Sequence, residues 1–207
     1  MRPHAFLLLA SLAVAGCTIP PTGPVEVTRF VAAATVARLG SGTIHIETAP
    51  GENADPAELL PYKAAVAREL VALGYRETAR ADAAQIARVR VERGIVASGA
   101  ARGPVTVGVG GGSGSYGGGA GVGIGINLGG GQREIVSTRL EVRIDDALTG
   151  TSLWEGRALF DVASSALLAD RAQNANVAAE ALFRDFPGND GQTVEVPVTT
   201  QPQETSE

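Results

Sequence analysis

The chain of 207 residues contains a single cysteine, Cys17, and a single lysine, Lys63. One cysteine excludes a disulfide within the chain and any metal site built from several thiolates. Aromatic residues make up only 4% of the sequence against 44% hydrophobic residues, so the core must consist mainly of Val, Leu, Ile and Ala. The formal net charge of −5 and the scattered arginines argue against nucleic-acid binding, for which a basic stripe is expected.

Short motifs that mark catalytic or nucleotide-binding sites are also missing. No HExxH, CxxC, GxSxG or Walker sequence occurs, and the one GxGxxG match, residues 112–117, has no buried strand before it and no helix after it. His45 lies in an alternating run that predicts an exposed position on a strand. Asp145 and Asp146 are adjacent carboxylates at a hairpin turn, where Asp serves backbone geometry. We therefore expect no enzyme activity, no metal, no nucleotide and no other cofactor.

Residues 1–16 have the features of a secretory signal peptide, in which Arg2 precedes an apolar run of about a dozen residues that is too short to span a membrane. The following VAGC, residues 14–17, resembles the bacterial lipobox, in which the cysteine thiol is diacylated and the chain is cut just before it. Thr18 replaces the Asp that retains some lipoproteins in the inner membrane. The resemblance implies lipidation of Cys17 and an outer-membrane anchor with the domain facing the periplasm. The alternative is that Cys17 is an ordinary small residue near a conventional cleavage site.

A Pro-rich tether over residues 17–24 precedes a single domain of residues 25–198, and residues 199–207 form a disordered tail. Alternating runs predict strands over 25–31, 43–48 and 87–92, a long antiparallel hairpin over 135–162 with Trp154 on its core face, and a small strand over 192–198. Helical spacing predicts helices over 61–73 and roughly 168–185. The first is expected to begin only at Pro61, which lacks the N–H that a helix interior needs, so residues 56–60 should form a loose turn. This order predicts an α+β fold, a mixed, mainly antiparallel sheet with two helices packed on one face.

Residues 99–131 form a glycine-rich insert that holds more than half of the chain's 27 glycines. Aliphatic residues alternate with glycine on both flanks, which predicts a β-hairpin with one aliphatic face, although a tolerated loop insert stays open. That face should be covered by the domain's own core, by another protein or by the lipid surface. The candidate contact residues are Val105, Val107, Val109, Val122, Ile124 and Ile126.

Four stretches occur in a characteristic order, LVALGY, ADAAQIARVRV, RLEVRIDDALTGTSLWEG and ALFRDFPG. In these the sequence resembles a family of bacterial envelope lipoproteins, domain of unknown function 4136 (DUF4136), over about residues 25–198. The resemblance implies an α+β lipoprotein domain in the cell envelope, without known catalytic residues. The leading hypothesis is an outer-membrane-anchored lipoprotein that serves as a non-enzymatic structural or binding module in the periplasm. The alternative is an accessory subunit of an envelope assembly that docks through the glycine-rich hairpin or a sheet edge.

Overall fold

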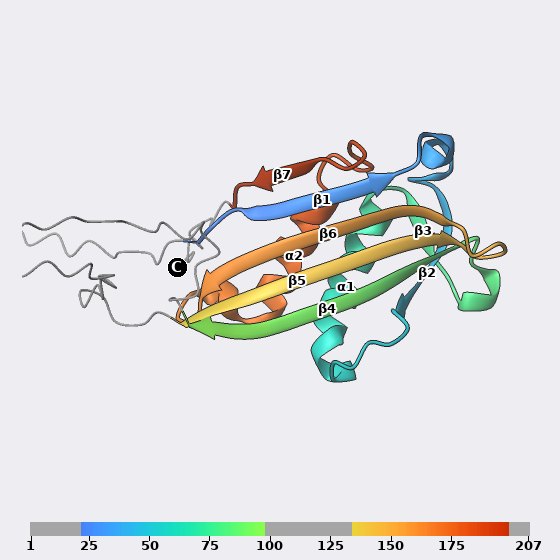
Figure 1. The fold of residues 1–207 in the computed structure, drawn as a ribbon. Coiled ribbons are helices and arrows are strands. Elements are labelled where there is room, and N and C mark those ends of the chain that lie inside the picture. The colour runs from blue at the N-terminus through green and yellow to red at the C-terminus, as the bar shows by residue number, and fades with distance from the viewer. Residues whose placement is uncertain (1–21, 98–133, 199–207) are drawn as a thin grey trace, which may run out of the picture.

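The structure is a computed structural model that describes residues 22–97 and 134–198 (Figure 1). The elements follow in the order β1 (Val25–Val31), η1 (Ala33–Arg38), β2 (Gly42–Thr48), α1 (Pro56–Ala72), β3 (Tyr75–Glu77), η2 (Arg80–Asp82), β4 (Gln85–Ala97), β5 (Glu134–Asp146), β6 (Ser152–Ala163), η3 (Leu167–Ala169), α2 (Arg171–Phe183) and β7 (Thr193–Val196).

The strands form one sheet in the order β3-β2-β4-β5-β6-β1-β7. β2 runs parallel to its neighbours β3 and β4, with α1 as the crossover between β2 and β3, and every other pair is antiparallel. β4 and β5 pair along their whole length, from Gln85 opposite Asp146 to Ala97 opposite Glu134. The hairpin predicted over 135–162 is confirmed as β5 and β6.

Both helices lie on one face of the sheet and pack against each other (Figure 1). The core lies between the two layers, and its largest fully buried side chains are Trp154, Tyr62 and Phe160. The predicted α+β class is confirmed, since a mixed, mostly antiparallel sheet carries two main helices. The hairpin predicted within residues 99–131 lies outside the described residues.

The prediction that the first helix begins at Pro61 is wrong, because α1 already begins at Pro56. Asp55 caps it, accepting a hydrogen bond from the Ala57 N–H at 2.8 Å, and Pro56 suits the first helical position. Pro61 lies inside the helix, where its missing N–H deprives only the carbonyl of Ala57. Ala57 is exposed in the first turn, so its carbonyl is accessible to solvent and the helix tolerates the loss.

The second helix is shorter at both ends than the predicted 168–185. Asp170 caps α2 by accepting hydrogen bonds from the backbone N–H groups of Ala172 and Gln173. At the other end, Arg184 leaves the helical conformation. Ala172 lies in the first turn and is exposed. The strand β3 was not predicted, because three residues are too short to display a period of two.

The start of β1, the end of β4, the start of β5 and the end of β7 all lie at one end of the sheet (Figure 1). Val25 at the start of β1 pairs with Val196 at the end of β7, while Ala97 at the end of β4 pairs with Glu134 at the start of β5. The turn between β5 and β6 and the short helix η1 lie at the opposite end. The tether and the glycine-rich insert therefore connect to the domain on the same side.

Candidate functional site

The residues for which the sequence predicts a functional role fall mostly outside the described residues. Cys17 precedes them, and so the structure does not place the predicted lipidation site. The same holds for the predicted contact residues Val105, Val107, Val109, Val122, Ile124 and Ile126. The other residues singled out in the sequence, His45, Trp154, Asp145 and Asp146, lie within the domain.

Trp154 on β6 is part of a buried aromatic cluster. It is 1% exposed and stacks on Phe183 at the end of α2, with ring centroids 5.4 Å apart. Phe186 lies 5.2 Å from the Trp154 ring, and the indole N–H donates to the carbonyl of Pro187 at 2.9 Å. Gly156 makes room for the indole, since a Cβ there would lie 2.2 Å from Trp154 Cη2. The interpretation of Trp154 as a core residue is confirmed, and the stretches LWEG and ALFRDFPG meet in this cluster.

Arg29 on β1 is a buried arginine that caps the end of α2. Its side chain donates to the carbonyls of Leu182 at 3.0 Å, Ala181 at 3.1 Å and Arg184 at 2.6 Å, and the residue is only 5% exposed. These carbonyls have no partner within the helix, and a cation suits the negative end of the helix dipole. Burial lowers the pKa of Arg29, an effect that the nearby Asp185 opposes. Arg29 was not among the predicted functional residues, and its signal in the sequence is a charge at an inward-facing position of an alternating strand.

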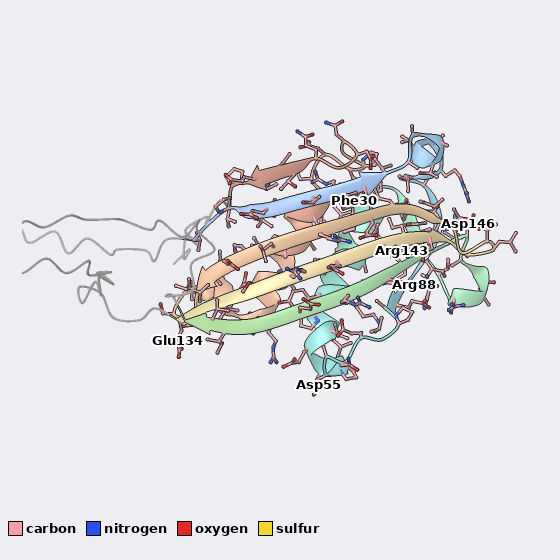
Figure 2. All side chains as sticks on the ribbon, viewed as in Figure 1. Phe30, Asp55, Arg88, Glu134, Arg143 and Asp146 are labelled. Carbon is pink, nitrogen blue, oxygen red and sulfur yellow. The ribbon has the colours of Figure 1, made fainter. Side chains whose placement is uncertain are left out.

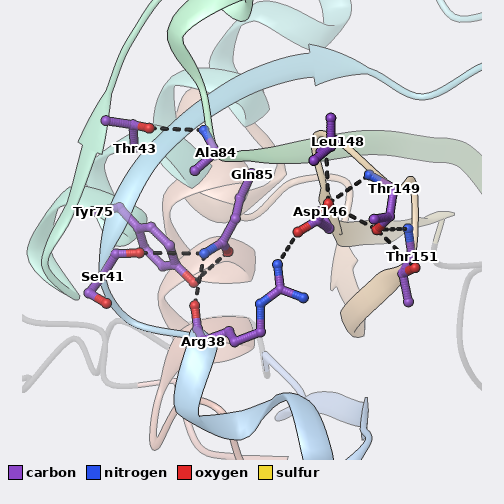
Figure 3. A network of polar contacts seen from close by, with 10 residues as sticks. All are labelled: Arg38, Ser41, Thr43, Tyr75, Ala84, Gln85, Asp146, Leu148, Thr149 and Thr151. Atoms are coloured by element: carbon purple, nitrogen blue, oxygen red, sulfur yellow. Dashed lines mark hydrogen bonds and ion pairs between the residues drawn. The ribbon is translucent and has the colours of Figure 1, made fainter.

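Asp146 closes the turn between β5 and β6 (Figure 3). One carboxylate oxygen accepts hydrogen bonds from the N–H groups of Leu148 at 3.0 Å and Thr149 at 2.7 Å and from the Thr149 hydroxyl at 2.9 Å. The other forms an ion pair with Arg38 of η1. The hydrogen bonds from Thr149 and Arg38 lower the pKa of Asp146 to about 2. The predicted role of Asp146 in turn geometry is confirmed.

A second group of polar contacts extends this network towards β3 (Figure 3). The Gln85 amide donates to the carbonyl of Arg38 at 2.8 Å, and the Tyr75 hydroxyl donates to Gln85 Oε1 at 3.3 Å. The Gly40 N–H in turn donates to the Tyr75 oxygen at 2.9 Å, and burial raises the pKa of Tyr75. These contacts fix η1 and the loop after it against the sheet, which is a structural role.

Asp145 does not serve the turn, and the prediction of that role for it is wrong. Its side chain is 1% exposed, accepts from Arg143 Nε at 2.7 Å and pairs with Arg88. Both arginines lie on the sheet face opposite the helices (Figure 2). Arg88 also pairs with Glu47 at 3.1 Å. Arg88 and Arg143 stand directly opposite each other on β4 and β5. Like charges in that position repel, and the carboxylate between them offsets the repulsion.

A shallow hollow of about 370 Å³ lies over the same sheet face. Most of its charges are paired, since Arg157 contacts Glu155 at 2.5 Å and Glu141 at 3.8 Å, and Arg88 and Arg143 both pair with Asp145. Exposed pairs of this kind contribute roughly 0–1 kcal/mol each, and the lining carries both signs of charge. The hollow is lined by Ala49, Pro50, Arg88, Arg90, Glu141, Val142, Arg143, Glu155 and Arg157.

His45 lies on β2, and its Nδ1 is 3.0 Å from the carbonyl oxygen of Thr78. The side chain is half-buried, so the predicted exposed position is only partly correct. Within residues 22–97 and 134–198, no three His, Cys, Asp or Glu side chains are grouped so that they could hold a metal ion. In the same residues, no helix combines the length and apolar character required to cross a membrane.

A groove of about 500 Å³ lies beside the outer edge of β4 at the end where the glycine-rich insert begins. Leu59 and Tyr62 of α1 and Val136 of β5 contribute its apolar lining, and Val91 and Ile95 come from β4 itself. Charged residues line the rest of the groove, namely Glu52, Glu58, Glu92, Arg93 and Arg171. This groove was not predictable from the sequence, because it depends on how far β2 extends along β4.

The family model of a domain of unknown function, DUF4136, matches residues 46–188. This is well over half of the chain, and the protein belongs to the DUF4136 family. The resemblance inferred from the sequence is confirmed. No protein among the curated ones matches the sequence.

Two solved structures illustrate what the fold is similar to. The PelC dodecamer from Paraburkholderia phytofirmans has 12% sequence identity over 77% of this chain and 96% of that chain, with a TM-score of 0.39. A PDZ domain protein from Parabacteroides distasonis has 13% identity over 84% of this chain and 39% of that chain, with a TM-score of 0.47. Both similarities are remote in sequence and partial in structure.

Proposed function

We propose that this DUF4136 protein is an outer-membrane lipoprotein whose domain lies in the periplasm and acts there as a non-enzymatic structural or binding module. One observation carries the proposal: the only cysteine, Cys17, directly follows a small residue at the end of the apolar run, in a sequence that resembles a lipobox. Several acyl chains anchor a protein stably, since each buried methylene contributes about 0.8 kcal/mol.

The position of β1 supports this arrangement. Only the tether separates Cys17 from Val25, and an extended chain of that length spans at most about 27 Å. An anchor at Cys17 would therefore hold the end of the sheet that carries Val25 within about 27 Å of the membrane surface. Ala97 and Glu134, which flank the glycine-rich insert, lie at the same end. The insert then starts and finishes on the membrane side of the domain.

The contacts of the ionisable side chains support a non-enzymatic role. Asp146 binds the backbone of its own turn, Asp145 is held between two guanidinium groups, and His45 bonds a backbone carbonyl. Each of these groups serves the fold. A general acid or base needs a side chain within hydrogen-bond reach of a substrate.

The anchor is tested by feeding cells a palmitate analogue and detecting the label on the protein. Cys17→Ser should abolish labelling and leave an unprocessed or soluble protein. The matched variant Thr18→Asp should keep the label but move the protein from outer-membrane to inner-membrane fractions. A Cys17→Ser protein that is still labelled contradicts lipidation, and a Thr18→Asp protein that stays in the outer membrane contradicts the sorting step.

The non-enzymatic part is tested with the purified domain. We expect no turnover in a screen of ester, peptide and glycoside substrates. An activity that disappears in His45→Ala, with an unchanged melting temperature, would show that the domain is an enzyme.

A further inference from the structure

β4 extends well beyond the strand that pairs with its outer edge. β2 pairs only with the part of β4 from Gln85 to Val89, and the last bond on that side runs from the Ala49 N–H to the carbonyl of Val89 at 2.9 Å. Along the rest of β4, up to Ala97, no strand within residues 22–97 or 134–198 lies on that side. This part of β4 is a sheet edge.

Two hydrogen bonds show in which direction the backbone N–H and carbonyl groups of this edge point. The Val91 N–H donates to the Glu52 carboxylate at 3.1 Å, on the same side as the bonded Val89 carbonyl. Backbone groups alternate along a strand, so the N–H and carbonyl groups of Arg93 and Ile95 point the same way. The amides of Gly94 and Val96 point to β5 instead. Burial alone would raise the pKa of Glu52, but its bonds to backbone N–H groups and nearby Arg90 hold that pKa below its ordinary value, so this cap is charged at neutral pH.

The side chains at this edge favour the pairing of a further strand with β4. Ile95 and Val96 are 67% and 44% exposed, which is unusual for aliphatic residues within a long strand. The groove of about 500 Å³ lies on the helix side of the edge, with Leu59, Tyr62 and Val136 in its lining. An added strand would hydrogen-bond to the backbone of β4 and bury alternate side chains in the groove.

We propose that residues 105–109 of the same chain occupy this edge as a strand antiparallel to β4, with Val105, Val107 and Val109 in the groove. Ala97 and Glu134 are paired, so a turn of about two to five residues would connect β4 and β5. Residues 98–133 intervene instead, and the first aliphatic run in them follows β4 after a short stretch, residues 98–104. That stretch is long enough for the chain to turn back along β4. A segment that follows β4 closely in the sequence can pair with this edge at a small cost in loop-closure entropy. This favours residues 105–109 over a second molecule.

The register follows from the side-chain faces. Residues directly opposite in an antiparallel pair point to the same face, so the three valines stand opposite residues such as Arg93 and Ile95, which face the groove. The N–H of Val107 then points at β4. Thr106 and Gly108 face the opposite side of the sheet, where Glu92 and Gly94 already lie. The insert thereby extends the sheet of the domain.

The test is hydrogen exchange, followed by NMR, on the mature chain carrying Cys17→Ser. The amides of Arg93 and Ile95 should exchange slowly in this protein. Val107→Pro removes the N–H that faces β4 and should speed their exchange at least about tenfold, whereas the amides of Gly94 and Val96, bonded to β5, should stay protected and show that the fold is intact. Ile124→Pro, in the second aliphatic run, is the matched control and should leave Arg93 and Ile95 protected.

Each other outcome overturns the proposal. Fast exchange of Arg93 and Ile95 before any substitution means that nothing pairs with the edge. Protection lost in Ile124→Pro but kept in Val107→Pro assigns the edge to the second run. Protection that rises with protein concentration, together with a dimer in light scattering, assigns it to a second copy. Protection that arises only when envelope extract is added assigns it to another protein.

Discussion

Replacing Gly156 with Ala tests the packing that joins β6 to α2. The new Cβ would lie 2.2 Å from Trp154 Cη2, 2.7 Å from Cζ2 and 2.8 Å from Leu182 Cδ1. Trp154 cannot move away easily, because it is stacked on Phe183 and its indole N–H is bonded to Pro187. Overpacking of this kind costs about 1–3 kcal/mol. For a domain of this size, that loss lowers the melting temperature by about 3–10 °C.

Calorimetry of five proteins, namely the unsubstituted chain, Gly156→Ala, Trp154→Phe, the double variant and Gly94→Ala, separates this clash from a general effect of the added methyl group. Trp154→Phe removes the indole atoms nearest to the new Cβ, so Gly156→Ala should cost at least about 1 kcal/mol less in that background. Gly94→Ala is the matched control on β4, where a Cβ would meet nothing within 4 Å, and it should be neutral or slightly stabilising. An unchanged melting temperature in Gly156→Ala, or an equal cost in both backgrounds, would refute the reasoning.

Two further predictions concern charged groups. Arg29→Met leaves the last carbonyls of α2 without their buried donor and should lower the free energy of unfolding by on the order of 2–4 kcal/mol in denaturant titration. Arg29→Lys should not restore this stability, because an ammonium group cannot reproduce the planar guanidinium. Equal midpoints for Arg29→Met and the unsubstituted protein would contradict the capping role. The folded-state pKa of Asp146 is lowered to about 2, so its contribution to stability is present above the unfolded pKa near 4 and is lost as the pH falls to about 2. Asp146→Asn should therefore be less stable than the unsubstituted protein at pH 7, with a difference that closes between pH 4 and pH 2, and a difference independent of pH would show that the carboxylate charge is not involved.

The strands were predictable where one face of the sheet is buried and the other is solvated. β1, β2, β5 and β6 alternate apolar and polar residues along their length, and this period follows directly from burial. The turn role of Asp146 followed from the residue type and its place before Gly150. These features depend on neighbours in the sequence.

The features that escaped prediction depend on residues far apart in the chain. Arg29 meets carbonyls more than 150 residues later, and only the packing of α2 on β1 brings them together. Asp145 reaches Arg88 because β4 and β5 are paired in one particular register. The helix start at Pro56 was not predicted for a different reason: Pro61 disfavours a helix interior in general, but here the only carbonyl that loses its bond is that of Ala57 in the first turn.

The place of β1 between β6 and β7 has a mechanical consequence. β1 is antiparallel to both neighbours, and its first residue, Val25, is where the tether joins the sheet. A pull from an anchor at Cys17 would act along the strand axis, so the hydrogen bonds on both sides of β1 would be loaded in shear, all at once. A strand peeled from a sheet edge breaks its bonds one after another instead. Drag between the membrane and anything attached to the domain would therefore be resisted by the hydrogen bonds to both neighbouring strands together.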